Sequence, residues 1–349
     1  MSTGQQVGVS IALCCHNSAR LLPRTLEHLK VQRVSAEVFW EVLVVDNAST
    51  DDTAEVARQC WGADVSVPMR VVKEPRLGLS YARERAFREA RYQIVSFVDD
   101  DNWITDDWIS TVNECMVLDP QLAAIGSRVT TVADVPLPKW FGRYSQYYGE
   151  LPFSDPATIS TWFLIGAGMT IRKSAWYWLN DHGFRSRLTD RRGSRLSTGG
   201  DLELGFALRL AGWKIRLEPR LRVKHYMTER RLKWRYLRRL LRSNGEANVV
   251  LDSYILAFQS QQRDLLSRLR QVWWVRLAKE TVELGYRFPP WKIIGALLRE
   301  MESDDAVAAI ELRAGRLIGL LRLRAGYGEL RKDVARAQWR KIHFGEVLR

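Results

Sequence analysis

The sequence has few cysteines, no long uncharged apolar run and no leader-like segment at its start. Its four cysteines, Cys14, Cys15, Cys60 and Cys115, include no C-x-x-C pair, and adjacent cysteines cannot readily close a disulfide or complete a tetrahedral metal site. We therefore interpret them as buried thiols in a reducing compartment.

Residues 1–8 lack the charged and apolar regions of a secretory signal. Because charged residues interrupt every apolar run of the roughly 18 residues that span a membrane, we expect a cytoplasmic protein that contacts the inner face of the cell membrane only peripherally, if at all.

The composition is that of a globular chain with unevenly distributed charge. Of 349 residues, 46% are hydrophobic, 10% aromatic and 27% charged, which suffices for a sizeable core. The length exceeds what one compact α/β domain usually needs. From Tyr226 onward there are 25 basic and 14 acidic side chains, against 28 and 26 before it. Most of the formal net charge of +13 therefore comes from the last third of the chain.

Short apolar runs alternate with helical segments in the first hundred residues. The runs are too short for helices and suit strands buried on both faces; they occupy 7–13, 41–45, 69–72 and 94–98. The intervening segments predict a helix capped by Ser18, a second after the capping-box-like residues 49–52, and a third at 80–90. This order predicts a Rossmann-like, mostly parallel sheet with helices on both faces. Ligands of such sheets bind at the carboxyl ends of the strands.

The second half of the chain begins irregularly and ends in helices. Residues 136–163 are rich in proline and aromatics and predict loops and short helices over a binding face. Regular structure is expected to return at 165–171, followed by a helix at about 201–211 and two short extended segments at 214–217 and 221–225. Beyond Thr228 the pattern is helical and basic, with its clearest break at Phe288-Pro289-Pro290. We expect a catalytic domain at 1–227 and a helical C-terminal extension at 228–349.

Three consecutive aspartates, Asp99 to Asp101, follow the strand predicted at 94–98. Neighbouring carboxylates raise one another's pKa unless a cation lies among them. Mg²⁺ and Mn²⁺ are hard ions that bind carboxylate oxygens and commonly share their coordination with substrate phosphates. The run indicates either a divalent metal site or an acidic turn that caps a helix at Thr105.

Four polar motifs follow the predicted strands. They are Cys15-His16-Asn17, the D-x-x-S-x-D pattern from Asp46 to Asp51, the G-L-S-x-A-R segment from Gly78 to Arg83, and the D-x-D pattern from Asp99 to Asp101. In order and spacing they resemble the family 2 glycosyltransferases of GT-A fold. With a later motif around Asp201, the resemblance covers roughly residues 7–225. It implies an inverting, hexosyltransferase-like enzyme that moves a sugar from a nucleotide-diphosphate donor, most simply a UDP-sugar, to a hydroxyl of a glycan or lipid-linked acceptor.

The resemblance also implies roles for the matching residues. The implied donor-binding residues are Cys15, Asn17, Asp46, Arg83 and Asp99. Asp46 would accept hydrogen bonds from the nucleobase or ribose. A Mn²⁺ or Mg²⁺ cofactor held by Asp99 and Asp101 would stabilise the departing nucleotide diphosphate. His225 is a further candidate metal ligand, and as a lone histidine it suits a hydrogen-bonding role near the acceptor or in the core equally well.

The candidate catalytic base lies in the later motif, where this chain departs from related enzymes. Related sequences carry Glu-Asp where this chain has Gly200-Asp201, which leaves Asp201 as the aligned base and Glu203 as a reserve. Side chains two residues apart on a helix point about 200° away from each other around the axis, so Asp201 and Glu203 cannot point at the same hydroxyl. The alternative is that Asp201 only suits the positive end of the helix dipole.

The basic extension contains a predicted amphipathic helix. Four arginines would fall within about a 60° arc of it: Arg231, Arg235, Arg238 and Arg242. This stripe could face an anionic membrane, or it could face solvent while the apolar side packs on the catalytic domain. In the first case, three tryptophans could lie at the membrane interface: Trp273, Trp274 and Trp291.

Two other classes of function compete with a glycosyltransferase. A sugar nucleotidyltransferase also uses a nucleotide, a metal and an α/β sheet, but it usually needs a glycine-rich phosphate loop near the N-terminus, and residues 12–20 have none. A nucleic-acid-binding protein would use the basic extension and its aromatics, which leaves Asp46, Asp99 to Asp101 and Asp201 without a role. We therefore expect a nucleotide-sugar donor and a glycan or lipid-linked acceptor as partners, and no nucleic acid.

Overall fold

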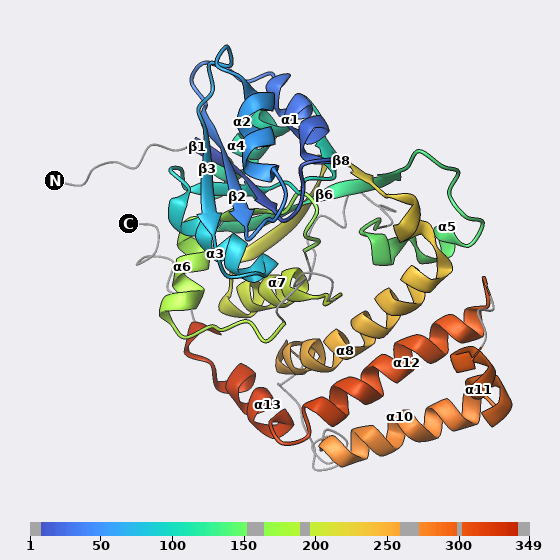
Figure 1. The fold of residues 1–349 in the computed structure, drawn as a ribbon. Helices are drawn as coiled ribbons and strands as arrows, with labels where there is room; N and C mark the ends of the chain where they lie inside the picture. The colour runs from blue at the N-terminus through green and yellow to red at the C-terminus, as the bar shows by residue number, and fades with distance from the viewer. Residues whose placement is uncertain (1–7, 152–163, 189–195, 259–271, 299–301, 341–349) are drawn as a thin grey trace.

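The computed structural model describes residues 8–151, 164–188, 196–258, 272–298 and 302–340. Within these residues an eight-stranded sheet has the order β3-β2-β1-β4-β7-β6-β8-β5 (Figure 1). The strands are β1 Gly8–Cys15, β2 Phe39–Asn47, β3 Met69–Glu74, β4 Ile94–Phe97, β5 Asn102–Ile104, β6 Leu122–Val132, β7 Thr170–Arg172 and β8 Lys214–Tyr226. Strands β1 to β4 pair in parallel, as do β6 and β8. This confirms the predicted mostly parallel α/β fold.

Side chains of β1 alternate between two hydrophobic clusters. Val9, Ile11 and Leu13 join the cluster that contains α1, α2 and α4, whereas Ala12 and Cys14 pack on the cluster that contains α3, α6 and α7. Because successive strand residues point to opposite faces, a strand that is apolar throughout must be covered on both sides. The helices are α1 Leu22–Lys30, α2 Thr53–Trp61, α3 Leu79–Glu89, α4 Trp108–Leu118, α6 Lys173–Asp181 and α7 Gly200–Ala211.

Three local predictions need correction. Ser18 does not cap α1: the helix begins at Leu22, and the Ser18 hydroxyl accepts a hydrogen bond from the His16 N–H at 3.1 Å. Of the regular structure predicted at 165–171, only the start of β7 is present, because the left-handed Gly168 (φ 71°) turns the chain just before this strand. The segments predicted at 214–217 and 221–225 form one strand, β8, whose pairing with β6 is irregular near Gly126.

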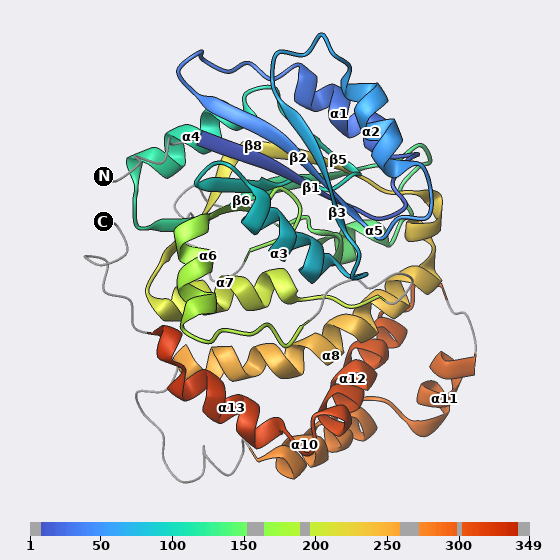
Figure 2. The ribbon, with the colours of Figure 1, turned by 60° about the vertical axis from the view of Figure 1, so that its left-hand side comes forward.

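The C-terminal extension is helical, as predicted, and it shares a core with the sheet domain. Its longer helices are α8 Trp234–Phe258, α10 Trp273–Arg287, α11 Pro290–Leu298, α12 Asp305–Arg322 and α13 Tyr327–Arg336. Helix α7 lies between the sheet and α8 (Figure 2). Tyr254 of α8 and Val334 of α13 belong to the same hydrophobic cluster as α6 and α7. The boundary proposed near residue 227 therefore falls just after the last strand, and one core cluster crosses it.

Helices α8 and α12 pack at unusually close range. A Cβ atom on Gly315 would lie 2.0 Å from the carbonyl oxygen of Arg242, and one on Gly245 would lie 2.1 Å from that of Leu312. Close beside this crossing, the buried Glu311 of α12 pairs with two arginines of α8, Arg238 at 2.8 Å and Arg242 at 2.6 Å. Glycines thus permit the approach, and ion pairs to the buried Glu311 carboxylate fix its register.

This packing corrects the prediction of a continuous basic stripe on the amphipathic helix. Arg238 and Arg242 bind Glu311, and Arg231 precedes α8 and pairs with Asp101. Arg235 alone of the four predicted stripe residues is exposed. None of the helices in the described ranges is long and apolar enough to span a lipid bilayer. The remaining short helices are α5 Phe141–Tyr144 and the 3₁₀ turns η1 Ser145–Tyr148, η2 Glu229–Leu232 and η3 Gln338–Arg340.

Candidate active site

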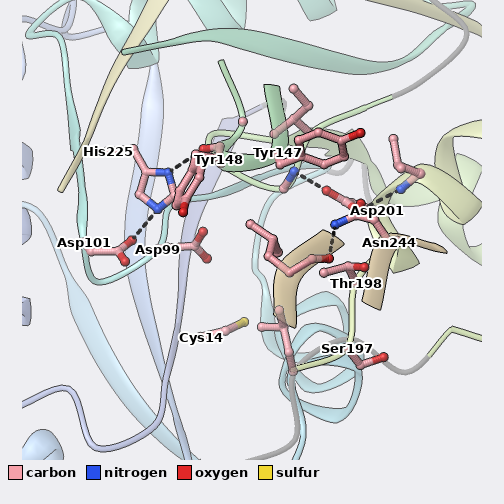
Figure 3. A pocket seen from close by; sticks show the side chains of 18 of the residues that line it. Cys14, Asp99, Asp101, Tyr147, Tyr148, Ser197, Thr198, Asp201, His225 and Asn244 are labelled. Carbon is pink, nitrogen blue, oxygen red and sulfur yellow. Dashed lines mark hydrogen bonds and ion pairs between the residues drawn. The ribbon is translucent and has the colours of Figure 1, made fainter. Parts of the chain in front are cut away.

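A cavity of about 910 Å³ lies at the carboxyl ends of the parallel strands. Its walls are the turn after β1, the start of α3, the acidic loop after β4, the N-terminus of α7 and one face of α8. Figure 3 shows Asp99, Asp101 and His225 on one side, with Asp201 and Asn244 on the other. The sequence-predicted residues that line the cavity are Cys15, Asn17, Arg83, Asp99, Asp101, Asp201 and His225.

The turn after β1 is held by the turn after β2. Asn17 takes the left-handed conformation (φ 54°), which asparagine tolerates better than most residues. Its side-chain oxygen accepts a hydrogen bond from the Thr50 N–H at 2.8 Å, and its own N–H donates to the Ser49 hydroxyl at 3.1 Å. These bonds fix the main chain of residues 15–17 at the cavity wall. Burial raises the pKa of the adjacent Cys14 thiol to about 12, so this lining residue is an uncharged thiol.

Asp46 lies behind the cavity wall rather than in it. Its carboxylate accepts a hydrogen bond from the Ser49 N–H at 3.3 Å, and Asp46 is absent from the cavity lining. The next residue, Asn47, does line the cavity. The Asn47 amide donates to the Arg76 carbonyl at 2.7 Å and accepts from the Gly78 N–H at 2.8 Å. Asn47 therefore holds the loop before α3, a role that sequence analysis missed.

The acidic loop contains three carboxylates in different surroundings. Burial, and then the neighbouring Asp101 charge, raise the pKa of Asp100 to about 7. The Asp99 carboxylate accepts a weak hydrogen bond from the Asn102 amide at 3.4 Å. Asp101 is buried, and its Oδ2 atom pairs with Nη1 of Arg231 at 2.6 Å. The Arg231 guanidinium therefore offsets part of the repulsion expected among the three aspartates.

His225 lies against the same carboxylate. Its Nδ1 atom lies 3.2 Å from the carbonyl oxygen of Tyr148, and its Nε2 atom lies 3.5 Å from Oδ1 of Asp101. A carbonyl accepts hydrogen bonds only, so Nδ1 is the nitrogen that can donate to Tyr148, while Nε2 faces the Asp101 carboxylate and lies 3.5 Å from Nη2 of Arg231. Metal-binding histidines are commonly oriented by such a hydrogen bond.

These residues fit a divalent cation chemically, although they are not gathered into a closed ligand set. Carboxylate oxygens from Asp99 and Asp101 and the imidazole nitrogen of His225 are ligands that suit Mn²⁺. The Oδ1 atom of Asn102, at the base of the acidic loop, is buried without a hydrogen-bond partner. In the described part of the chain, no three His, Cys, Asp or Glu side chains are close enough to hold a metal ion. A bound ion would have to draw these groups closer together, beside the ion pair that Arg231 makes with Oδ2 of Asp101.

Asp201 lies in the first turn of α7 and faces the cavity. The left-handed Gly199 (φ 98°) starts this helix. The Asp201 carboxylate accepts the Gly166 N–H at 2.6 Å through Oδ2 and the Leu202 N–H at 2.9 Å through Oδ1. A Cβ atom on Gly166 would come within 2.9 Å of the Arg83 guanidinium and 3.3 Å of Asp201. Gly166 thus lets both charged groups approach one stretch of backbone.

Glu203 is turned away from the cavity. It is fully buried, and its carboxylate accepts hydrogen bonds from the Ser186 hydroxyl, the Tyr254 hydroxyl, and the N–H groups of Arg187 and Leu188, at 2.6 to 3.1 Å. Burial raises the pKa of Glu203, and these hydrogen bonds oppose that rise. Glu203 therefore ties α7 to α8 and to the loop at 185–188. The rotation expected between positions 201 and 203 is what separates the two carboxylates.

Some aromatic residues of the segment 136–163 pack in the hydrophobic core, and others line the cavity. Trp140 and Phe141 are buried in a cluster with Trp234 of α8, whereas Tyr147 and Tyr148 line the cavity. Residues 152–163 of this segment lie outside the described ranges. Arg231 and the cavity-facing side of α8 were not predicted as site residues. Their positions depend on the packing of α8 against α7 and α12, for which no local motif exists.

Comparisons with known proteins show what the first half of the chain is similar to. Residues 10–177 match the model of the family Glycosyl transferase family 2. Over 123 residues the chain is 28% identical to chondroitin synthase of Escherichia coli, and over 101 residues it is 33% identical to the uncharacterized glycosyltransferase YfnE of Bacillus subtilis (strain 168). These matches cover 35% and 29% of this chain and only 17% and 25% of the two relatives.

A solved structure agrees with this similarity at the level of the fold. A mannosyltransferase of Pyrobaculum calidifontis, in complex with GDP-Man and Mn²⁺, aligns with a TM-score of 0.52 and 17% identity over 91% of this chain and 87% of that one. TarS of S. aureus aligns with a TM-score of 0.48 and 15% identity over 92% of each chain. Residues 10–177 therefore match family 2 glycosyltransferases, and the fold is of the GT-A type, as the strand-end motifs predicted.

Proposed function

We propose that the protein transfers a sugar from a nucleotide-diphosphate donor, a UDP-sugar, to a hydroxyl of a glycan or lipid-linked acceptor with inversion at the anomeric carbon. One observation carries this proposal: a single cavity is lined by the strand-end turns, by the Asp99 and Asp101 carboxylates and by Asp201. Single displacement needs stabilisation of the leaving group on one side of the sugar and a base on the other. The cavity offers both kinds of group.

The donor would lie along the wall formed by the turns after β1 and β2 and the acidic loop after β4, which we call the strand-end wall. Residues 15–17 and Asn47 offer main-chain and amide groups to the nucleoside, while Asp46 would act through the turn that it stabilises. The diphosphate would face Arg83 and Arg231, two cavity-lining guanidiniums. Arginine stays charged at all physiological pH values and binds phosphate oxygens in a forked geometry. These two side chains therefore suit a doubly charged leaving group.

Asp99, Asp101 and His225 would hold Mn²⁺ or Mg²⁺ beside that diphosphate. The bound ion supplies electrophilic assistance by neutralising the charge that develops on the leaving group. Without it, Arg231 neutralises Asp101. On binding, Arg231 would exchange Asp101 for the diphosphate, which keeps its buried charge paired in both states.

Asp201 would act as the base on the opposite side. Two main-chain N–H groups hold its carboxylate at the cavity wall. It would take the proton of the acceptor hydroxyl while that oxygen bonds to the anomeric carbon. Attack opposite the leaving group inverts the configuration. Glu203 is a positioning residue in this scheme, because its carboxylate is fully buried and bonded to α8 and the loop at 185–188.

A peripheral membrane contact would use α10 and α11 rather than α8. Exposed apolar side chains concentrate on these two helices, with exposed fractions of 54% to 91%: Trp274, Val282, Tyr286, Trp291 and Ile294. Positions 274, 282 and 286 are separated by multiples of four residues and so follow one stripe of α10. Lys279, Arg287 and Lys292 are exposed on the same helices. Tryptophan, tyrosine and basic side chains together suit the headgroup region of an anionic bilayer.

A panel of nucleotide sugars tests the proposed function. Each UDP- and GDP-sugar is added to the full chain with Mn²⁺ or with EDTA, and thermal stabilisation and hydrolysis of the donor are measured. A ligand at a hundred times its Kd adds about 2.7 kcal/mol to the free energy of unfolding. We expect stabilisation and slow hydrolysis with at least one UDP-sugar, and only with the metal. Salt-sensitive binding of nucleic acid, with neither effect, would instead support the nucleic-acid interpretation.

A further inference from the structure

One face of α8 forms a wall of the cavity, although α8 lies outside residues 10–177 that match the glycosyltransferase family. The residues on this wall recur at three- and four-residue steps, which places them on one side of the helix. They are Tyr236, Leu240, Asn244, Asn248, Leu251 and Ile255. The cavity therefore extends from the strand ends along about five turns of the C-terminal extension.

Two carboxamides lie at the centre of this wall. The Nδ2 atom of Asn244 donates to the Leu240 carbonyl at 2.8 Å, and the Asn248 side chain makes no hydrogen bond with any residue of the described ranges. Asparagine is a poor residue for a helix interior. Each carboxamide can donate and accept at the same time. The two side chains lie one turn apart and present polar groups to the cavity, although asparagine lowers the stability of the helix.

The wall begins beside the proposed base. The Thr198 and Ser243 hydroxyls are 3.3 Å apart, which joins the start of α7 to α8 one residue before Asn244. A Cβ atom on Gly199 would lie 3.1 Å from that of Ala247, between the two asparagines along the helix. In Figure 3, Asn244 lies next to Thr198 and Asp201, away from Asp99 and Asp101. A group bound to this wall would approach Asp201 from the side opposite the carboxylate pair.

The far end of the wall is polar as well. Asp252 lines it, and its carboxylate is held by Arg276 at 2.5 Å and Arg316 at 2.8 Å. This ion-pair cluster joins α8 to α10 and α12 and so fixes the position of the far end of the wall. Along this path polar groups alternate with the apolar side chains of Leu240, Leu251 and Ile255, so sugar hydroxyls would find hydrogen-bond partners and sugar ring faces would find apolar contacts.

We propose that this face of α8 is the acceptor subsite and that it binds the carbohydrate part of the acceptor. Asn244 and Asn248 would hydrogen-bond hydroxyls of one sugar residue, and Tyr147 and Tyr236, which also line the cavity, would pack on its ring. The proposal rests on the proposed glycosyl transfer. The C-terminal extension would then supply acceptor specificity, while the family domain would supply donor binding.

The test separates acceptor binding from donor chemistry. Full-length Asn244→Ala, Asn248→Ala and double variants are compared with Arg239→Ala, an exposed position of the same helix outside the cavity lining. Three quantities are measured: UDP affinity with Mn²⁺, donor hydrolysis by water, and transfer to a panel of p-nitrophenyl mono- and disaccharide glycosides. Each Asn variant should lower kcat/KM for the glycoside at least tenfold through its KM. UDP affinity and hydrolysis should stay within about twofold.

Several outcomes would overturn the subsite. Unchanged transfer in the double variant, an equal loss of UDP affinity, or transfer only to an acceptor without sugar residues would each reject it. If the unsubstituted chain hydrolyses no nucleotide sugar, the proposed function fails instead. The subsite is then decided by direct binding of the full chain to an array of glycans: binding that Asn248→Ala removes and Arg239→Ala retains supports the subsite, and absence of binding rejects it.

Discussion

The cavity has two walls, and they are built by different means. The strand-end wall consists of short turns after parallel strands, each fixed by hydrogen bonds to the next turn, such as those between Asn17 and Thr50. The α8 wall belongs to a 25-residue helix that reaches the cavity only because it packs on α7 and α12. Glycine contacts and the Glu311 ion pairs hold that packing.

This difference shows how the two halves of a transfer site can vary separately. A turn between neighbouring strands is determined by a few consecutive residues, so its chemistry stays with the motif. A helix packed on the outside of the domain can change its cavity-facing residues while its packing residues stay the same. In this protein the turns proposed to bind the nucleoside lie within the matched family residues, Arg231 and His225 are added from beyond them, and the wall proposed for the acceptor lies wholly beyond them.

The largest expected effect comes from Asp201, which lies where the two walls meet. Asp201→Asn keeps the shape of the side chain but cannot take a proton, so single-turnover transfer should fall by about a hundredfold to ten-thousandfold. UDP affinity should remain the same. Glu203→Gln serves as a contrast, because the structure gives Glu203 a packing role: it should lower the free energy of unfolding more than the rate. Loss of transfer in Glu203→Gln with transfer retained in Asp201→Asn would reverse the two roles.

The second effect tests the strand-end wall. Asp101→Asn should lower Mn²⁺-dependent donor hydrolysis by at least about a hundredfold, comparable to the loss of one preorganised electrostatic group. Titration of Mn²⁺ in the presence of UDP, followed by calorimetry, should show a matching loss of metal affinity. The fold should persist, because the carboxamide oxygen of the variant can still accept a hydrogen bond from Arg231. Equal turnover and metal affinity in the variant and the parent chain would remove Asp101 from the metal site.

The third effect concerns Arg231, which precedes α8 and touches the strand-end wall. Arg231→Gln leaves Asp101 without its 2.6 Å partner and removes a proposed diphosphate ligand. The KM for the donor should rise about tenfold to a hundredfold, the range for a lost charged hydrogen bond of 1.5–3 kcal/mol. Arg230→Gln, at the exposed neighbouring position, is the control and should change little. A lower donor KM in Arg231→Gln would mean that the arginine only blocks the site.

The fourth effect tests whether the α8 wall depends on helix packing. Gly315→Ala would put a methyl group 2.0 Å from the Arg242 carbonyl oxygen, so the free energy of unfolding should fall by about 1–3 kcal/mol. In the folded fraction, transfer to the acceptor should suffer more than UDP binding. Gly328→Ala, where the added methyl meets open space on α13, should be neutral or stabilising. Urea unfolding and calorimetry measure the two quantities. Equal stability of both variants would show that the crossing tolerates a wider approach.

The smallest effect concerns the exposed apolar side chains of α10 and α11, which we propose to contact a membrane and which belong to neither wall. Trp274→Ser with Trp291→Ser should weaken co-sedimentation with anionic vesicles about threefold to tenfold, because each tryptophan contributes interfacial burial on the order of 1 kcal/mol. Leu118→Ser, an exposed apolar position on α4, provides the control. Transfer to a soluble glycoside should be unaffected. Vesicle binding that is absent in the parent chain, or equal in all variants, would reject the membrane contact.

Much of the strand-end wall could be predicted from the sequence. Apolar runs at 41–45 and 94–98 marked strands that the structure extends or shortens by only a few residues, and the polar residues after them line the cavity. Asp46 was the exception. It supports the turn from behind, while Asn47 reaches the cavity, because alternation along a strand decides which of two adjacent polar residues faces the site. A motif indicates such a pair but does not determine which side chain binds.

The sequence by itself determined the α/β order, the break at Phe288-Pro289-Pro290 and the position of the acidic loop, because each depends on periodicity or on residues adjacent in the chain. Only the tertiary structure decided that Arg231 pairs with Asp101, that Glu203 is buried against Tyr254, and that α8 lines the cavity. Each of these contacts joins residues 51 to 130 positions apart or whole helices. Their partners are selected by the packing of apolar faces and by close glycine contacts, which no local pattern of residues specifies.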